Sequence, residues 1–176
     1  MKKIILAVMA AAMIFSCTAC MSNSSQIEIV YTSEAPDAKT IKVDDYEDSL
    51  DGLTKYLIAL GYAPKNTAAT KMLSETIGAK DGVRYVFAVN SSSVDLELYE
   101  YDMENLNDKA KEVLEDVKKN GEFTLFTDSE TGETQTFEAT LSDSGKYLMI
   151  YMDSSSNEDN VARKNDIIKT VKSFKK

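Results

Sequence analysis

Histidine is absent from this chain of 176 residues. Without an imidazole, the chain has no Ser-His-Asp or Cys-His catalytic group and lacks the ligand on which most zinc and haem sites depend. Both cysteines lie among the first twenty residues, so no disulfide can hold the remainder together. A folded domain must therefore rely on a hydrophobic core, which a content of 43% hydrophobic residues allows. These absences favour a protein that is not an enzyme.

A long hydrophobic run is also missing. The apolar stretch at residues 4–15 would make a helix about 18 Å long at roughly 1.5 Å per residue. A bilayer core of about 30 Å needs around 20 apolar residues, so this stretch is too short to span it comfortably. Lys2 and Lys3 precede the stretch and small residues follow it, which is the layout of a bacterial secretory signal. We predict that residues 1–19 are a signal peptide that is removed.

The end of this segment resembles the lipobox of bacterial lipoproteins, in which a small residue precedes an obligatory cysteine. Thr18 and Ala19 lead into Cys20, so the resemblance implies that Cys20 carries a diacylglyceryl group and becomes the mature N-terminus. Cys17 departs from the pattern, because an aliphatic residue is usual there. Three other interpretations remain open: a C-x-x-C redox or metal site, ordinary cleavage after residue 19 that releases a soluble protein, and an uncleaved anchor.

The charge of the chain is acidic, at −9, and removal of residues 1–19 makes it −11 because Lys2 and Lys3 are lost. An acidic surface repels nucleic-acid phosphates, so we expect no nucleic-acid partner. The same charge repels anionic lipid headgroups, so the membrane would be held through the acyl chains alone. We therefore expect a domain anchored by lipid on the extracytoplasmic face of the cell membrane.

The rest of the chain predicts one domain of the α+β class. Residues 20–40 are expected to be the lipidated cysteine and a tether, and residues 41–176 the domain. We predict a mainly antiparallel sheet of about five strands with three to four helices packed on it. Hydrophobic periodicity and turn signals predict helices over 44–60, 67–77, 107–119 and 158–174, and strands over 83–89, 94–101, 122–126, 134–141 and 146–152.

Two of these strands have informative faces. Residues 146–152 are apolar on both faces, which is typical of a central strand covered on both sides. On the strand at 94–101, Asp95, Glu97, Tyr99 and Tyr101 share one face by alternation, which predicts a solvated face. Tyrosine offers flat apolar area with a polar tip, so Tyr99 and Tyr101 are the residues we expect at a binding face.

Two further segments carry a family resemblance. The sequences Ile77-Gly-Ala-Lys-Asp-Gly82 and Val94-Asp-Leu-Glu-Leu-Tyr-Glu-Tyr-Asp102 resemble small uncharacterised lipoproteins of anaerobic Gram-positive bacteria. With the signal, and the helix expected from Asn107, the resemblance covers less than half of the chain. It implies extracytoplasmic anchoring and an α+β domain. It implies no activity and so supplies no catalytic residues.

Catalytic and cofactor motifs are few. Glu97, Glu100 and Asp102 lie close in sequence, and paired carboxylates can cleave glycosides. The acidic residues at 44–51 lack the glycine spacing of a calcium loop, and no glycine-rich nucleotide motif occurs. We expect no cofactor and no metal. The leading hypothesis is a non-catalytic binding domain for a protein or small polar ligand, with a carboxylate-dependent envelope hydrolase and a purely structural surface lipoprotein as alternatives.

Overall fold

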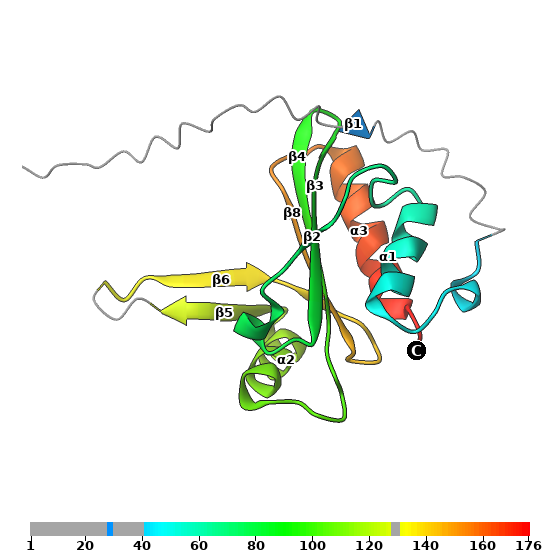
Figure 1. The fold of residues 1–176 in the computed structure, drawn as a ribbon. Coiled ribbons are helices and arrows are strands. Elements are labelled where there is room, and N and C mark those ends of the chain that lie inside the picture. Colours follow the sequence, from blue (N-terminus) through cyan, green and yellow to red (C-terminus); the bar gives the residue numbers. More distant parts are fainter. Residues whose placement is uncertain (1–27, 30–40, 128–130) are drawn as a thin grey trace, which may run out of the picture.

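A six-stranded sheet forms the centre of the fold, and helices and a separate two-stranded hairpin are added to it (Figure 1). The computed structural model describes residues 28–29, 41–127 and 131–176, so Cys20, the predicted signal and most of the predicted tether lie outside the described residues. Among the described residues, no helix combines the length and the apolar character needed to cross a membrane. The elements in chain order are β1 (Glu28–Ile29), η1 (Val43–Asp45), α1 (Leu50–Ala59), β2 (Thr70–Lys71), η2 (Ser74–Ile77), β3 (Asp81–Val89), β4 (Ser92–Glu100), α2 (Asp108–Asn120), β5 (Glu122–Thr127), β6 (Thr134–Glu138), β7 (Thr140–Leu141), β8 (Tyr147–Asp153) and α3 (Glu158–Ser173).

The main sheet confirms the predicted α+β class and the mainly antiparallel pairing. Its strand order is β1-β3-β4-β8-β7, with β2 also paired to β3, and only the short β1 runs parallel to its neighbour. The β3–β4 hairpin turns at Asn90 and Ser91, whose φ angles are 48° and 64°. Positive φ at both central residues is the condition for a type I′ turn, whose twist matches that of the strands. The turn is therefore tighter than the four residues expected from the sequence.

The sheet has two apolar faces, and β8 contributes to both. Tyr147 and Met149 pack into the core cluster shared with α1 and α3, while Leu148 and Ile150 pack into the cluster shared with α2 and the hairpin. All four side chains are buried. The prediction of a central strand covered on both sides is confirmed.

The strand expected over residues 134–141 is divided between two sheets. Its first part, β6, pairs with β5 in a hairpin that projects away from the main sheet, and its second part, β7, pairs with the edge of β8 (Figure 1). The chain changes sheets at Ala139, whose N–H donates to the carbonyl of Gly121 at 2.9 Å. That hydrogen bond joins the two ends of the hairpin at its base.

The first helix begins later than the sequence predicted. Residues 43–45 form only a 3₁₀ turn, and α1 begins at Leu50. Two groups fix this start: the side chain of Ser49 accepts a hydrogen bond from the N–H of Gly52, and the buried carboxylate of Glu100 accepts one from the N–H of Leu50 at 2.8 Å. Both acceptors satisfy amide groups that have no partner inside the first turn of a helix.

The helix predicted over residues 67–77 is wrong. The segment instead forms β2 and the short 3₁₀ helix η2. Thr70 and Lys71 pair with β3, and the N–H of Met72 donates to the carbonyl of Gly82 at 2.9 Å. Pairing with the open edge of β3 thus replaces the local helical hydrogen bonds, a tertiary effect that periodicity does not detect. The remaining helices, α2 and α3, lie where they were predicted.

A buried arginine connects α3 to the core cluster that the sheet shares with α1 and α3. Arg163 is fully buried, and its guanidinium donates to the Tyr151 hydroxyl at 2.7 Å and to the Tyr62 carbonyl at 2.6 Å. The group also lies within 5.4 Å of the centre of the Phe87 ring. No carboxylate of the described residues forms an ion pair with it, so polar and aromatic contacts replace the usual salt bridge.

We expect Arg163→Ala to lower the free energy of unfolding by about 3–5 kcal/mol, because it leaves a cavity and two unpaired polar groups in the core. Arg163→Lys should also destabilise the fold, since one ammonium cannot reproduce the planar contacts to both acceptors and the ring. Urea unfolding followed by circular dichroism measures both changes. Wild-type stability in both variants would contradict a structural role for this side chain.

Candidate functional site

The predicted binding face of Tyr99 and Tyr101 is not a solvated face. The two side chains are only 5% and 1% exposed, so the prediction that they lie on a solvated face is wrong. Both belong to the core cluster under α2 and the β5–β6 hairpin, and the Tyr101 hydroxyl donates to the carbonyl of Ile77 at 3.2 Å. Burial raises the pKa of both hydroxyls, so they are neutral hydrogen-bond donors in the folded protein. The two tyrosines do share a face with Glu97, as alternation predicts, but elements distant in the sequence cover that face.

The three carboxylates considered for hydrolysis do not converge. Glu97 lies on the face of β4 toward the hairpin, whereas Glu100 lies on the opposite face and binds the N-terminus of α1. Asp102 follows the strand, where it accepts a hydrogen bond from the N–H of Glu104. Within the described ranges, no three acidic, cysteine or histidine side chains come together as metal ligands.

Glu97 nevertheless occupies an unusual environment. One carboxylate oxygen accepts a hydrogen bond from the Tyr99 hydroxyl at 2.8 Å, and the other lies 3.7 Å from Nε of Arg84. Arg84 makes its close contacts with Asp95, through two nitrogens. Burial, together with the charge of Asp95, raises the pKa of the Glu97 carboxyl, although Tyr99 and Arg84 oppose that change. The Tyr99 ring itself lies on Gly82, where an added Cβ would come within 2.6 Å of a ring carbon.

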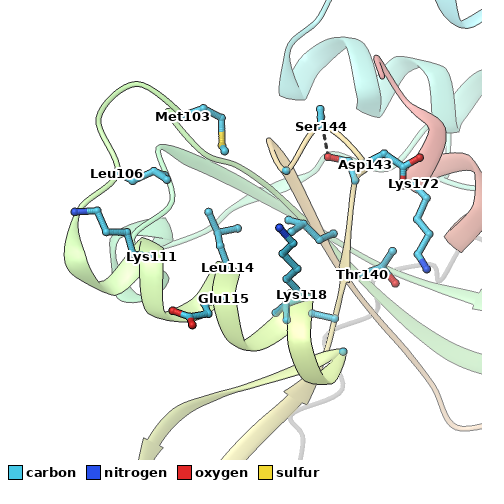
Figure 2. Close-up of a pocket in the computed structure, with 16 residues that line it drawn as sticks. Met103, Leu106, Lys111, Leu114, Glu115, Lys118, Thr140, Asp143, Ser144 and Lys172 are labelled. Atoms are coloured by element: carbon cyan, nitrogen blue, oxygen red, sulfur yellow. Dashed lines mark hydrogen bonds between the residues drawn. The ribbon is translucent and has the colours of Figure 1, made fainter.

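A large cleft lies on the side of the main sheet that α2 covers, between α2, β7 and the β7–β8 turn (Figure 2). Its volume is about 760 Å³, within the range of small-molecule sites. Apolar side chains from α2, from the connection before it and from residues 139–141 line much of it: Met103, Leu106, Leu114, Val117, Ala139 and Leu141. We refer to this hollow as the lysine cleft.

Three lysines line the cleft although the chain as a whole is acidic. Lys111 and Lys118 come from one side of α2, and Lys172 comes from the last turn of α3; in Figure 2, Lys118 and Lys172 lie on either side of Thr140. Lys111 forms a long ion pair with Asp108 at 3.5 Å. Over the part of the chain that the structure describes, neither Lys118 nor Lys172 forms an ion pair with an acidic side chain.

Two acidic side chains also line the lysine cleft, and they do not cancel its charge. Glu115 lies on α2, and Asp143 lies in the β7–β8 turn. Asp143 is already paired with Lys176, which is outside the lining, at 2.6 Å. The charge balance around the cleft is therefore positive. An apolar lining with ammonium groups can hold an anion that carries an apolar body.

The backbone fixes the position of the third lysine. The N–H of Asp143 donates to the carbonyl of Lys172 at 2.9 Å, which joins the β7–β8 turn to the end of α3. The turn is stabilised by its own contacts, including a hydrogen bond from the N–H of Tyr147 to the Ser142 hydroxyl at 3.0 Å. Lys172 is thus brought beside α2 by residues distant in sequence.

Sequence patterns alone do not identify the lysine cleft. The spacing of Lys111, Leu114 and Lys118 places them on one side of the predicted helix, and that was a usable signal. Lysines on a helix are far more often solvated than bound to a ligand, so the spacing alone does not single them out. The convergence with Lys172 depends on tertiary structure, which the pattern does not contain.

We expect Glu97→Gln to change how stability depends on pH. Because burial raises the pKa of Glu97 above its ordinary value of 4.5, the folded state binds this proton more tightly than the unfolded chain does. The stability that Glu97 contributes is fully present below that ordinary value and is lost as the pH rises through the raised pKa. Urea unfolding from about pH 4 to about pH 8 should show wild type losing stability relative to the variant. A constant difference between the two proteins would contradict the raised pKa.

Comparisons with known proteins provide no template for the lysine cleft or for the surroundings of Glu97. No protein-family model, no curated protein and no solved structure matches this chain. The shape and charge of the lysine cleft are therefore the basis on which a function can be proposed.

Proposed function

We propose that this protein is a non-catalytic, lipid-anchored domain on the extracytoplasmic face of the membrane, and that its lysine cleft binds a small anion with an apolar body. One observation carries the proposal. Lys118 and Lys172 both line a largely apolar cleft and have no acidic partners among the described residues, in a chain whose net charge is −9. A ligand of this class would satisfy both the charge and the apolar surface of the cleft.

The expected strength of binding follows from the exposure of these groups. Both lysine side chains are exposed, so each ion pair with a ligand would be screened by water and contribute about 0.2–1 kcal/mol. The apolar lining contributes roughly 25 cal/mol per Å² of apolar surface removed from water. Affinity should therefore come mainly from the apolar body, whereas the lysines select for negative charge.

We expect octyl phosphate to bind the purified protein more tightly than octanol does. Lys118→Gln and Lys172→Gln should each weaken octyl phosphate about two- to fivefold, and together about tenfold, because each removes one screened ion pair. Octanol affinity should not change. Isothermal titration calorimetry at low and high salt measures these differences, and salt should weaken only the phosphate.

The matched control is Lys119→Gln, which neutralises the neighbouring lysine of α2 that does not line the cleft. It should leave the affinity for octyl phosphate unchanged. Equal affinity for octyl phosphate and octanol in wild type, or an equal effect of all three lysine substitutions, would overturn the proposed site.

Support for the lipid anchor comes from the sequence. Cys20 follows two small residues at the end of a short apolar segment, and the net charge of the remainder of the chain is acidic, which disfavours attachment to anionic lipid by charge. Two or more acyl chains hold a protein on a membrane, at about 0.8 kcal/mol per buried CH₂, whereas one myristoyl chain binds only marginally. An anchored domain of this kind would present the lysine cleft outside the cytoplasm.

Metabolic labelling with a fatty-acid probe tests the anchor. We expect wild type to incorporate the probe and Cys20→Ala to lose it, because the chain has only one other cysteine and that residue is predicted to be removed with the signal. Cys17→Ser is the control and should still be labelled. Equal labelling of wild type and Cys20→Ala would refute Cys20 as the lipidated residue.

A further inference from the structure

A second hollow lies on the same side of the main sheet as the lysine cleft, but its net charge is negative. It lies between the β2–η2 segment and the β5–β6 hairpin and has a volume of about 350 Å³. That volume is at the small end of the range for small-molecule sites. Most of its lining is apolar: Met72, Leu73, Ile77, Phe123, Leu125, Phe137 and Ile150. Glu97 and Tyr99 are among its few polar lining residues, and we name it the Glu97 pocket.

The carboxylate of Glu97 is only partly compensated. Arg84 is its nearest cation, but the guanidinium directs two nitrogens at Asp95 and remains 3.7 Å from Glu97. The close group on Glu97 is the Tyr99 hydroxyl, a neutral donor. One arginine thus serves two carboxylates, which leaves a net negative charge beside an apolar pocket. A buried carboxylate in this position is stabilised by any cation that enters.

Lys71 is the cation at the mouth of the pocket, and it does not neutralise Glu97. Its ammonium group lies 3.7 Å from Asp81 and its side chain is mostly solvated, so no ion pair joins it to the pocket floor. Leu73 is 77% exposed and also lines the pocket. A large apolar side chain so exposed beside an apolar hollow gives a ligand further surface to cover.

We propose that the Glu97 pocket binds a small organic cation, a primary ammonium group on an apolar body, with the ammonium directed at Glu97. The apolar lining excludes a strongly hydrated metal ion, which would need several oxygen ligands. The negative floor disfavours the anions proposed for the lysine cleft. The two hollows therefore select ligands of opposite charge, and this inference does not depend on the proposed function of the cleft.

The test compares three probes of equal length on the wild-type protein: hexylammonium, hexanol and hexanoate. We expect hexylammonium to bind about tenfold more tightly than hexanol, because it adds a hydrogen bond to a charged group in a partly desolvated site. Hexanoate should bind more weakly than hexanol. Amide chemical shifts measured by nuclear magnetic resonance report both affinity and location, and the changes should centre on Met72, Leu73 and Ile150. Equal affinity of hexylammonium and hexanol, or shifts located elsewhere, would overturn the proposal.

Substitution of the carboxylate separates charge from shape. Glu97→Gln keeps an acceptor for Tyr99 and should lower hexylammonium affinity about tenfold, to that of hexanol, while hexanol affinity stays the same. The matched control is Glu138→Gln, an exposed carboxylate on β6 that does not line this pocket. It should bind hexylammonium as wild type does. Undiminished binding in folded Glu97→Gln would also overturn the proposal, and the probe series on wild type decides the matter if that variant does not fold.

The lysine variants keep the two proposals distinct. The double substitution of Lys118 and Lys172 by Gln should lose affinity for octyl phosphate and bind hexylammonium as wild type does. Loss of hexylammonium binding in that double variant would contradict an independent Glu97 pocket. Failure of octyl phosphate to bind wild type would refute the cleft and leave the pocket standing.

Discussion

A guanidinium group buried without a carboxylate holds one side of this molecule together. Arg163 joins three parts of the chain that are far apart in sequence: α3, the segment after α1 that contains Tyr62, and the central strand through Tyr151. A charge this deep is tolerated only where hydrogen-bond acceptors and aromatic rings replace water. The arrangement leaves Nε as the one buried side-chain polar atom of the described residues without a partner. The contacts of Arg163 therefore fix how α1 and α3 pack on their face of the sheet.

The two faces of the sheet are covered in different ways. The face under α1 and α3 is closed by a continuous core that extends from Leu50 to Phe174. The opposite face is covered by α2, η2 and the β5–β6 hairpin, which are three separate pieces. Residues of these pieces line the lysine cleft and the Glu97 pocket. Both faces carry a buried core, and the two hollows described above lie on the side of α2 and the hairpin.

Local signals in the sequence predicted the fold better than they predicted the site. The two apolar faces of β8 and the apolar periodicity of α2 and α3 are properties of single segments, so patterns detect them. The error over residues 67–77 arose because an open strand edge recruited that segment. Tyr99 was placed on the right face of its strand, but what covers that face is decided by elements distant in the chain. Lys172 reaches the cleft for the same kind of reason, so its role could not be read from sequence.

The hydrogen bond between Ala139 and Gly121 has a mechanical consequence. It joins the two residues at which the β5–β6 hairpin leaves the rest of the fold, so the hairpin is attached through a narrow base. Both residues line the lysine cleft, while Phe123, Leu125 and Phe137 of the hairpin form a wall of the Glu97 pocket. Any displacement of the hairpin would therefore alter the lining of both hollows.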